Sequence, residues 1–517
     1  MTATHGLDER NLIPRWRRFG DAVRSGELDA LPSVDGRHKE STPNQDLHEA
    51  VSAFTARPGL HTASDLVTQA AVANSRHEVA LKAARQILDG SASKPLRELS
   101  GLLLSNPDQG QPSIDNIPAE FDRNETIARA AKLKAVVRSE PRNAIRWTDL
   151  ALAHLNLGAA SKAERNIRTA VSLEPLNRFV LRSAVRLYVL IDEPETAHHL
   201  LTRDVRALND PWLRAAALAT ATLIGKPPSN IRASRQILES GRHPAWHLSE
   251  LAGQLATLEL NSGQLRKAKR TMRTALIDQT ENAVAQAEWA SQHGVDALGK
   301  IDLERPHSFE ARALAYRQSG KFAEGIRAGL HWQADQPFDH SPAVFVSYLA
   351  SVATQDYYLG ELAAKQGLIA NQHHGLLRNN LVFALANQGK VAEAREQLEH
   401  ILRPALGLRE ASTLVATKGL VAFRGGDPIT GRRLYAKAVD ELVALNDRDV
   451  AALAAVFWAR EELLLGSHEA ATAIVRALEL SQRSPSQEVY LWRDRLMQMA
   501  AQNVTLATPP TLTPLEP

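Results

Sequence analysis

The chain has 517 residues, with 61 Lys or Arg against 58 Asp or Glu, so its formal net charge is +3. This near balance argues against a general polyanion binder, and the length suits either several domains or one long repeat array. Because there are no cysteines, disulfides, thiolate catalysis and zinc fingers are excluded.

Targeting signals are not apparent in the sequence. The first residues are too polar for a secretory signal, and the longest apolar run, residues 215–225, is far shorter than a membrane-spanning helix of ~20 residues. The missing cysteines fit a reducing compartment. We therefore expect a cytoplasmic protein that does not bind a membrane.

A basic, aromatic-containing segment stands near the N-terminus. Residues 12–28 favour a helix, and residues 1–43 are interpreted as a basic helical arm followed by a polar linker. Two hypotheses stay open. The arm docks on a partner or on another copy of the chain, which would give self-association, or its aromatic residues merely anchor it to the end of the helical array. The candidate docking arm comprises Arg15, Trp16, Arg17, Arg18 and Phe19.

The next region, residues 44–118, reads as a separate helical region and linker. Its helical pattern begins near Asp46, and residues 65–75 and 77–88 form an expected pair that ends at Gly90. A stretch rich in Pro, Asn, Asp and Gly, residues 105–118, then interrupts the pattern and predicts a linker.

Residues 141–177 contain two helical periods in a row. The first covers residues 144–157 and the second residues 161–173, with Gly158 at the turn and Pro175 just after the end. The small and apolar residues fall where two packed helices need them, namely at Trp147, Leu150, Ala151, His154, Ala163, Ile167 and Ala170. This order resembles a tetratricopeptide repeat (TPR).

The same pattern recurs along residues 119–500. A turn glycine, with a small residue five positions later and a small or branched residue seven positions earlier, is found at Gly158, Gly263, Gly320, Gly389, Gly426 and Gly466. Gly158 and Gly263 lie 105 residues apart, which is three periods of 35, so degenerate repeats must fill the interval. The 57 residues between Gly263 and Gly320 are out of phase and predict an irregular pair near residues 294–306.

We therefore expect an all-α protein, a right-handed superhelical solenoid of TPR-like helix pairs with an N-terminal helical extension. A final helix over residues 487–500 closes the array, and residues 501–517 read as a disordered Pro- and Thr-rich tail. The resemblance implies a concave groove, lined by the first helix of each pair, that binds peptides or helices of other proteins. It thus implies a scaffold or adaptor, and an accessory role in a multi-protein bacterial assembly is a further hypothesis.

Candidate partner-binding residues follow from this register. Arg178, Arg182 and Arg186 form an i, i+4, i+8 ladder along one helix face, suited to carboxylates or phosphates of a partner. The alternative is a solvated face or pairing with a neighbouring repeat. Other candidates are Arg378 and Asn379 at the start of a first helix, and the apolar residues Phe179, Trp212, Phe383, Leu420 and Phe423.

A nucleic-acid-binding helical-repeat protein is the alternative function. Its support is a basic second helix in which Arg266, Lys269, Arg270 and Arg273 share one face, although a charged outer face is ordinary for such helices. The sequence contains no phosphate-binding loop, nucleophile elbow or metalloprotease motif. We therefore expect no catalytic, cofactor or metal site.

Overall fold

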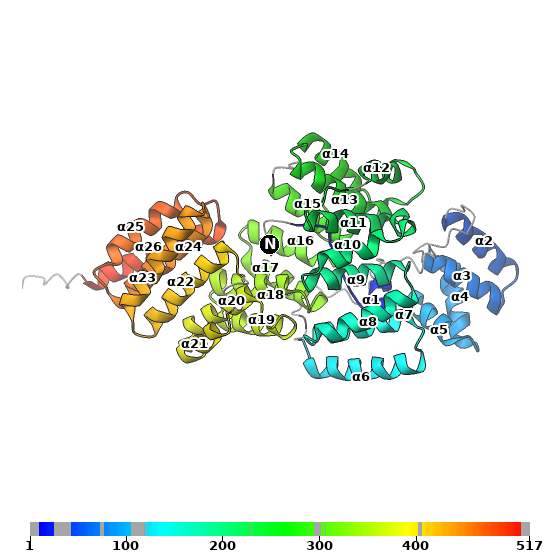
Figure 1. Ribbon diagram of the computed structural model, residues 1–517, viewed down its shortest axis with the longest axis horizontal. Coiled ribbons are helices and arrows are strands. Elements are labelled where there is room, and N and C mark those ends of the chain that lie inside the picture. Colours follow the sequence, from blue (N-terminus) through cyan, green and yellow to red (C-terminus); the bar gives the residue numbers. More distant parts are fainter. Residues whose placement is uncertain are drawn as a thin grey trace, which may run out of the picture. The chain divides into compact units, whose positions relative to one another are not determined.

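The computed structural model describes residues 10–24, 43–72, 77–104, 118, 121–228, 230–293, 301–305, 307–401 and 406–507 (Figure 1). All regular secondary structure in these residues is helical, which confirms the all-α class. The chain forms two compact units. Unit 1 comprises Ala3–Arg312 together with Ala334–Phe338, and unit 2 comprises Ala313–Gln333 together with Asp339–Pro517.

The N-terminal part of unit 1 is helical as expected, except in the arm. Residues 12–18 are not helical and α1 covers only Phe19–Arg24, so the predicted helix over residues 12–28 is wrong in its first half. Pro14 disfavours the helical conformation only for the residue before it. The main-chain groups of Leu12, Ile13 and Trp16 instead form hydrogen bonds with side chains of distant residues. The following helices are α2 (Pro43–Ala56), α3 (Leu60–Val72), α4 (Glu78–Asp89) and α5 (Lys94–Leu104).

The remaining helices of unit 1 are arranged mainly in pairs. They are α6 (Arg123–Ser139), α7 (Ala144–Asn156), α8 (Ala160–Leu173), α9 (Arg178–Leu190), α10 (Pro194–Thr202), the 3-10 helix η1 (Val205–Asn209), α11 (Pro211–Leu223), α12 (Ile231–Glu239), α13 (Ala245–Asn261), α14 (Leu265–Ala275) and α15 (Glu281–Gln292). We call α7, α9, α11, α13 and α15 first helices. The side chains of Asn143, Asn177 and Asp210 cap α7, α9 and α11 by accepting free backbone N–H groups.

Unit 2 continues the pairing. Its helices are α16 (Phe309–Gln318), α17 (Phe322–Asp335), α18 (His340–Leu349), the π-helix η2 (Ala350–Thr354), α19 (Tyr357–Ala370), α20 (Gly375–Asn387), α21 (Val391–Glu399), α22 (Leu408–Arg424), α23 (Pro428–Ala444), α24 (Arg448–Leu465), α25 (Ala470–Ser481) and α26 (Gln487–Ala507). The first helices here are α16, α18, α20, α22 and α24. Helix α26 begins at the predicted residue and runs seven residues past the predicted end, and residues 508–517 lie outside the described part.

The turn positions explain why some repeats were hard to recognise. All six predicted turn glycines have positive φ, for example 73° at Gly158, where a residue with a Cβ would be strained. The degenerate repeats turn at the same spacing, but with Asp192 (φ 62°) and Gln355 (φ 59°) in place of glycine. The fold is therefore periodic where the glycine pattern is not.

Small residues permit close helix packing in the expected register. Gly431 lies against Phe423, so that a Cβ at Gly431 would be 2.4 Å from the ring carbon Cδ2. The repeat after Gly466 is an exception: Ala471 is exposed and Val475 is 56% exposed, whereas Ala473 is buried. Helix α25 begins four residues after its glycine, whereas α8 begins two after Gly158, so the predicted register was wrong by two residues.

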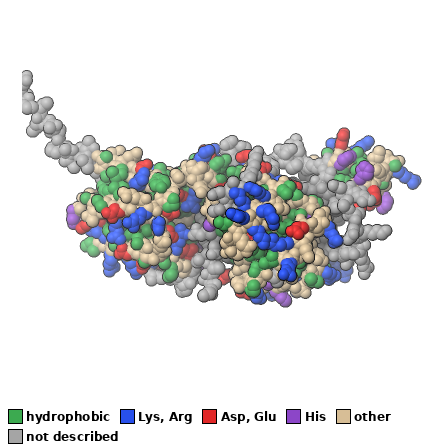
Figure 2. Space-filling model, turned by 90° about the horizontal axis from the view of Figure 1, so that it is seen from above, with side chains coloured by type: hydrophobic (Ala, Val, Ile, Leu, Met, Phe, Trp, Pro, Cys, Tyr) green, Lys and Arg blue, Asp and Glu red, His purple; other side chains and the backbone are tan. Residues whose placement is uncertain are grey.

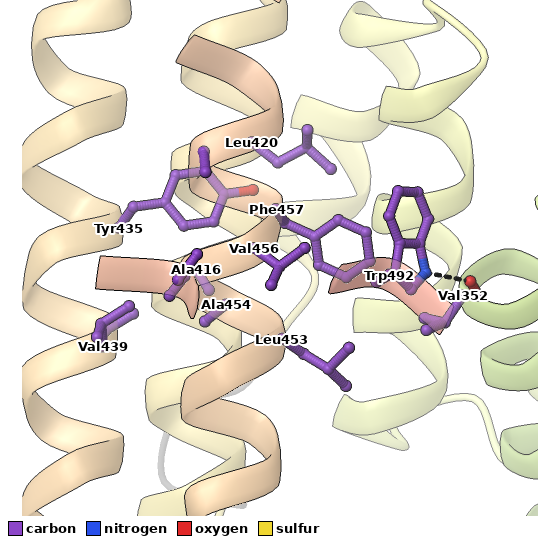
Figure 3. Close-up of a cluster of buried hydrophobic side chains, with 14 of the residues drawn as sticks. Val352, Ala416, Leu420, Tyr435, Val439, Leu453, Ala454, Val456, Phe457 and Trp492 are labelled. Carbon is purple, nitrogen blue, oxygen red and sulfur yellow. Dashed lines mark hydrogen bonds between the residues drawn. The ribbon is translucent and has the colours of Figure 1, made fainter. Parts of the chain in front are cut away.

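Most of the irregular stretch expected near residues 294–306, namely residues 294–300 and 306, lies outside the described residues. The described residues between His293 and Phe309 form no helix, so α15 has no second helix in the described chain, and the division between the units falls in α16. Unit 2 has a large apolar core around Leu420, Tyr435 and Phe457 (Figure 3). No helix among the described residues is long and apolar enough to span a bilayer.

A candidate peptide-binding groove in unit 1

The first helices of unit 1 hold a segment of the same chain. We call Arg10–Phe19 the arm and the surface that contacts it the groove. Leu12, Trp16 and Arg17 are at most 4% exposed, whereas Arg18 is exposed. The groove is formed by α7, α9, α13 and α15 with residues 310 and 335–338, so the arm contacts four of the five first helices of unit 1.

Amide side chains hold the main chain of the arm. The Leu12 N–H donates to Gln254 Oε1 at 3.1 Å, and Asn282 Nδ2 donates to the Ile13 carbonyl at 3.1 Å. Such contacts recognise any peptide backbone, whatever its side chains. Three further main-chain contacts are Gln286 Nε2 to the Arg10 carbonyl (3.1 Å), the Trp16 N–H to Gln336 Oε1 (3.5 Å) and the Phe19 N–H to Asp149 Oδ1 (2.9 Å).

Arg17 makes the most buried ion pairs of the arm. Its Nε lies 2.6 Å from Asp335 Oδ1 and its Nη2 lies 2.6 Å from Asp335 Oδ2. Its Nη1 lies 2.6 Å from Glu281 Oε1. Burial would raise the pKa of Asp335, but Arg17 and the nearby His307 hold it far below its usual value. Asp335 is therefore ionised, and Arg17 binds it in a planar geometry that lysine cannot match.

Arg15 and Arg10 share a third carboxylate. Arg15 Nη2 lies 2.5 Å from Glu310 Oε2, and Arg10 Nε lies 2.8 Å from Glu310 Oε1. Arg10 also donates to Gln286 Oε1 at 2.6 Å and to Asn282 Oδ1 at 2.8 Å. Three arginines of the arm thus face three carboxylates of the groove, which balances the charge of the buried contact.

Apolar contacts fix the register of the arm. The Trp16 ring meets Phe338 edge to face at 5.9 Å, and Phe19 meets Phe179 at 5.4 Å. Leu12 is fully buried and lies so close to α13 that a Cβ at Gly253 would be 2.9 Å from it. The groove therefore accommodates specific side chains at defined positions.

Two arginines of the predicted ladder, Arg182 and Arg186, contact other side chains of unit 1. Arg182 forms two hydrogen bonds with Glu250 at 2.7 and 3.1 Å, and its guanidinium lies 4.3 Å from the centre of the Trp212 ring. Arg186 lies over Phe338, the ring that contacts Trp16. These arginines are not outward-facing as expected, because each finds a carboxylate or ring within the chain.

The other candidates of unit 1 belong to the same supporting layer. Arg178 pairs with Asp210 at 2.5 Å, and Asp210 in turn caps α11 at Trp212. Arg178 pairs with the neighbouring repeat, as the alternative interpretation of the ladder proposed, whereas Glu250, the partner of Arg182, lies on α13, two repeats away. Phe179, the residue after Arg178, contacts Phe19 of the arm. A partner-binding role for these residues stays a prediction.

The candidates of unit 2 are mostly packing residues. Leu420 is fully buried, and Phe423 packs on Gly431. Arg378 donates to Gln397 Oε1 at 2.6 Å, Asn379 is 6% exposed, and Phe383 contacts Phe457 with ring centres 5.2 Å apart. Leu420 cannot offer contact area to a partner in this structure, because its side chain is fully buried in the apolar core of unit 2.

Unit 2 holds its own last helix against its first helices. Trp492 of α26 is 1% exposed, meets Phe457 of α24 at 4.7 Å and donates from Nε1 to the Val352 carbonyl at 2.5 Å (Figure 3). Arg317 of α16 pairs with Glu488 at 2.5 Å. Helix α26 therefore contacts first helices far apart in the sequence and covers part of their shared face.

The sequence analysis missed the polar residues that make the groove. Glu281, Asn282 and Gln286 all lie on α15, in a sequence otherwise rich in alanine, and Gln254 and Gln286 are fully buried. The available signal was a row of long polar side chains at the inner positions of helices whose other residues are small. Such residues are rarely buried unless their polar groups form hydrogen bonds or ion pairs.

The features that suggested nucleic-acid binding do not converge on the groove. Arg266, Arg270 and Arg273 are exposed on α14, a second helix, whereas the groove presents carboxylates. On the face seen in Figure 2, basic side chains gather in small groups among acidic and apolar ones. Among the described residues, no group of His, Asp and Glu has the arrangement of a metal site.

Comparisons with known proteins add little. No protein-family model and no curated protein matches the chain. Solved structures similar to it include yeast Tom70 (11% identity over 87% of this chain and 97% of that chain, TM-score 0.30). Others are the APC/C hetero-tetramer Cut9-Hcn1 (13%, 88% and 93%, TM-score 0.37) and Naa15/Naa10 bound to HypK-THB (13%, 93% and 80%, TM-score 0.23). At such low TM-scores these likenesses assign neither a family nor a function.

Proposed function

We propose that this protein is a non-catalytic helical-repeat scaffold in the cytoplasm that binds a segment of another protein along its first helices. One observation carries the proposal: the groove of unit 1 already holds ten residues of chain through main-chain and side-chain contacts. A surface that satisfies both the backbone and the side chains of a peptide has the chemistry of a peptide-binding site. The nucleic-acid alternative gains no support from a groove lined with carboxylates.

Photo-crosslinking in the native host tests this proposal. A photoreactive residue replaces Arg146 of α7, whose side chain is 28% exposed and lies 4.0 Å from Asp149, the carboxylate that accepts the Phe19 N–H. A matched variant carries the same residue at Arg270, which is exposed on the second helix α14. We expect a defined protein adduct from position 146 and none from position 270. Adducts only at position 270, or at neither position, would contradict the proposal.

A further inference from the structure

The groove of unit 1 suggests which kind of segment it binds. We propose that it takes a non-helical segment of a partner protein in which arginines flank a tryptophan, and that the arm is an intramolecular competitor for the same site. This inference rests on the proposed function. It goes further because it names the chemistry of the partner and the reason why the free groove is not exposed.

The carboxylates set the requirement for arginine. The side chains of Glu281 and Asp335 are 4% and 9% exposed, and Glu310 is 13% exposed. An occupant that covered the groove without bringing a cation would remove these three carboxylates from water without the arginines that they contact in this structure, which is strongly unfavourable. Any occupant must therefore bring positive charge to the positions of Arg15 and Arg17. The paired 2.6 Å contacts from Arg17 to both oxygens of Asp335 select guanidinium over ammonium.

The aromatic contact sets the requirement for a large ring between the two arginines. Trp16 meets the edge of Phe338, and Arg186 lies 5.5 Å from the centre of the same Phe338 ring. Phe338 is fully buried when Trp16 is in place. A small side chain at this position would leave an apolar space beside Phe338, so an Arg-Trp-Arg sequence fits better than a purely basic one.

The remaining contacts do not depend on the sequence of the occupant. Gln254, Asn282 and Gln286 bind the main-chain groups of Leu12, Ile13 and Arg10, and amide side chains would hold another backbone equally well. Because the arm belongs to the same chain, its binding to the groove is intramolecular, with an effective concentration on the order of millimolar. A separate partner segment therefore competes at a disadvantage of roughly 10²-fold or more.

The test uses a labelled peptide with the sequence of residues 10–21 and the full chain. The arm variant carries Arg15→Glu with Arg17→Glu, which places like charges against Glu281, Glu310 and Asp335 and expels the arm. We expect the peptide to bind the arm variant at least tenfold more tightly than the wild type. The same peptide with both arginines changed to Glu should not bind. The Arg18→Glu variant is the matched control, because Arg18 is exposed, and should bind as weakly as the wild type.

A second measurement covers the case in which the arm variant is poorly folded. Thermal unfolding is followed with and without the unlabelled peptide, and the peptide should then restore the melting temperature. Absence of both binding and restoration would overturn the inference, as would equal binding to the wild type and the arm variant. A stable complex between the wild type and the arm variant would assign the segment to a second copy and also overturn it. The scaffold proposal would survive these failures if the adduct at position 146 still formed.

Discussion

In unit 1 the first helices surround a non-helical segment through arginine–carboxylate pairs and amide contacts, whereas in unit 2 they carry a helix held mainly by apolar side chains. Arg17, buried between Asp335 and Glu281, is the centre of the first arrangement. Trp492, packed on Phe457 and 1% exposed, is the centre of the second. In the same repeat architecture, the first helices thus bind a non-helical segment in unit 1 and a helix in unit 2.

The difference lies in how specific each contact is. Buried ion pairs are strongly unfavourable when one partner is missing, so the groove of unit 1 discriminates sharply between occupants. Apolar packing in unit 2 depends on volume and shape, and it tolerates substitutions of similar size. We therefore expect unit 1 to respond to changes of charge and pH, and unit 2 to respond to changes of side-chain volume.

Removing the central arginine should have the largest effect on unit 1. Arg17→Ala leaves Asp335 and Glu281 buried without their cation, which should destabilise unit 1 by about 3–5 kcal/mol. Hydrogen exchange resolves the units, and amides of α15 should lose protection while those of α24 keep theirs. Arg18→Ala is the control, because Arg18 is 47% exposed and its ion pair with Asp21 is local in the sequence. Equal effects of the two substitutions would show that the buried pairs do not hold the arm.

Removing the central tryptophan should have a comparable effect on unit 2. Trp492→Ala removes a fully buried ring and its hydrogen bond to the Val352 carbonyl, which should destabilise unit 2 by about 3–5 kcal/mol. Here protection should fall in α24 and α26 and not in α15. Met497→Ala on the same helix is the control, since Met497 is 47% exposed. If the α15 amides lost as much protection as those of α24, the two units would not be independent in stability.

Asp149, which accepts the N–H of Phe19 at the end of the arm, should make the stability of the protein depend on pH. Burial raises the pKa of Asp149 to about 6, against the N–H of Phe19 and the guanidinium groups of Arg146 and Arg18, which lower it. The folded state therefore binds this proton more tightly than the unfolded state. Its contribution to stability is full below about pH 4 and is lost as the pH rises through 6. Asp149→Asn should thus stabilise the protein at pH 7 by roughly 1–3 kcal/mol, at about 1.4 kcal/mol per pKa unit.

Denaturant unfolding of both proteins at pH 7 and pH 4 checks this. The side-chain oxygen of Asn can still accept the Phe19 N–H, so the backbone contact is kept in the variant. The difference in stability between the wild type and the variant should be present at pH 7 and vanish at pH 4. Because both proteins contain all the other carboxylates, comparing them at the same pH cancels the contributions of those groups. A variant that is less stable than the wild type at pH 7 would mean that the Asp149 charge stabilises the arm.

The repeats could be predicted because their packing has few solutions. A turn with positive φ favours glycine, and helices in close contact require small residues such as Ala151 and Gly419, so both leave a periodic trace in the sequence. Asp192 and Gln355 fill the same turns without glycine, which hid their repeats. Residues 12–28 were predicted as a helix from their composition, but residues 12–18 are not helical.

The groove could be predicted only in part, because it is made by contacts between distant parts of the chain. The sequence singled out Arg15, Trp16 and Arg17, but nothing near them indicates Glu281 or Asp335, which lie more than 260 residues away. The arginine ladder was recognised as a set, yet its partners Asp210 and Glu250 lie on other repeats. A charged side chain can be read from the sequence. Which carboxylate it pairs with depends on how the chain folds.

The smallest effect is expected on the outer surface of unit 1. Arg266→Glu with Arg270→Glu changes two exposed side chains of α14 that take no part in the groove, so stability should change by less than about 0.5 kcal/mol. Peptide binding and the adduct at position 146 should be unchanged. Gel-shift titration across a range of salt concentrations checks the nucleic-acid hypothesis with the same pair of proteins. If the wild type bound nucleic acid with a steep salt dependence that the variant lost, α14 would be a functional surface and the groove would not be the main binding site of unit 1.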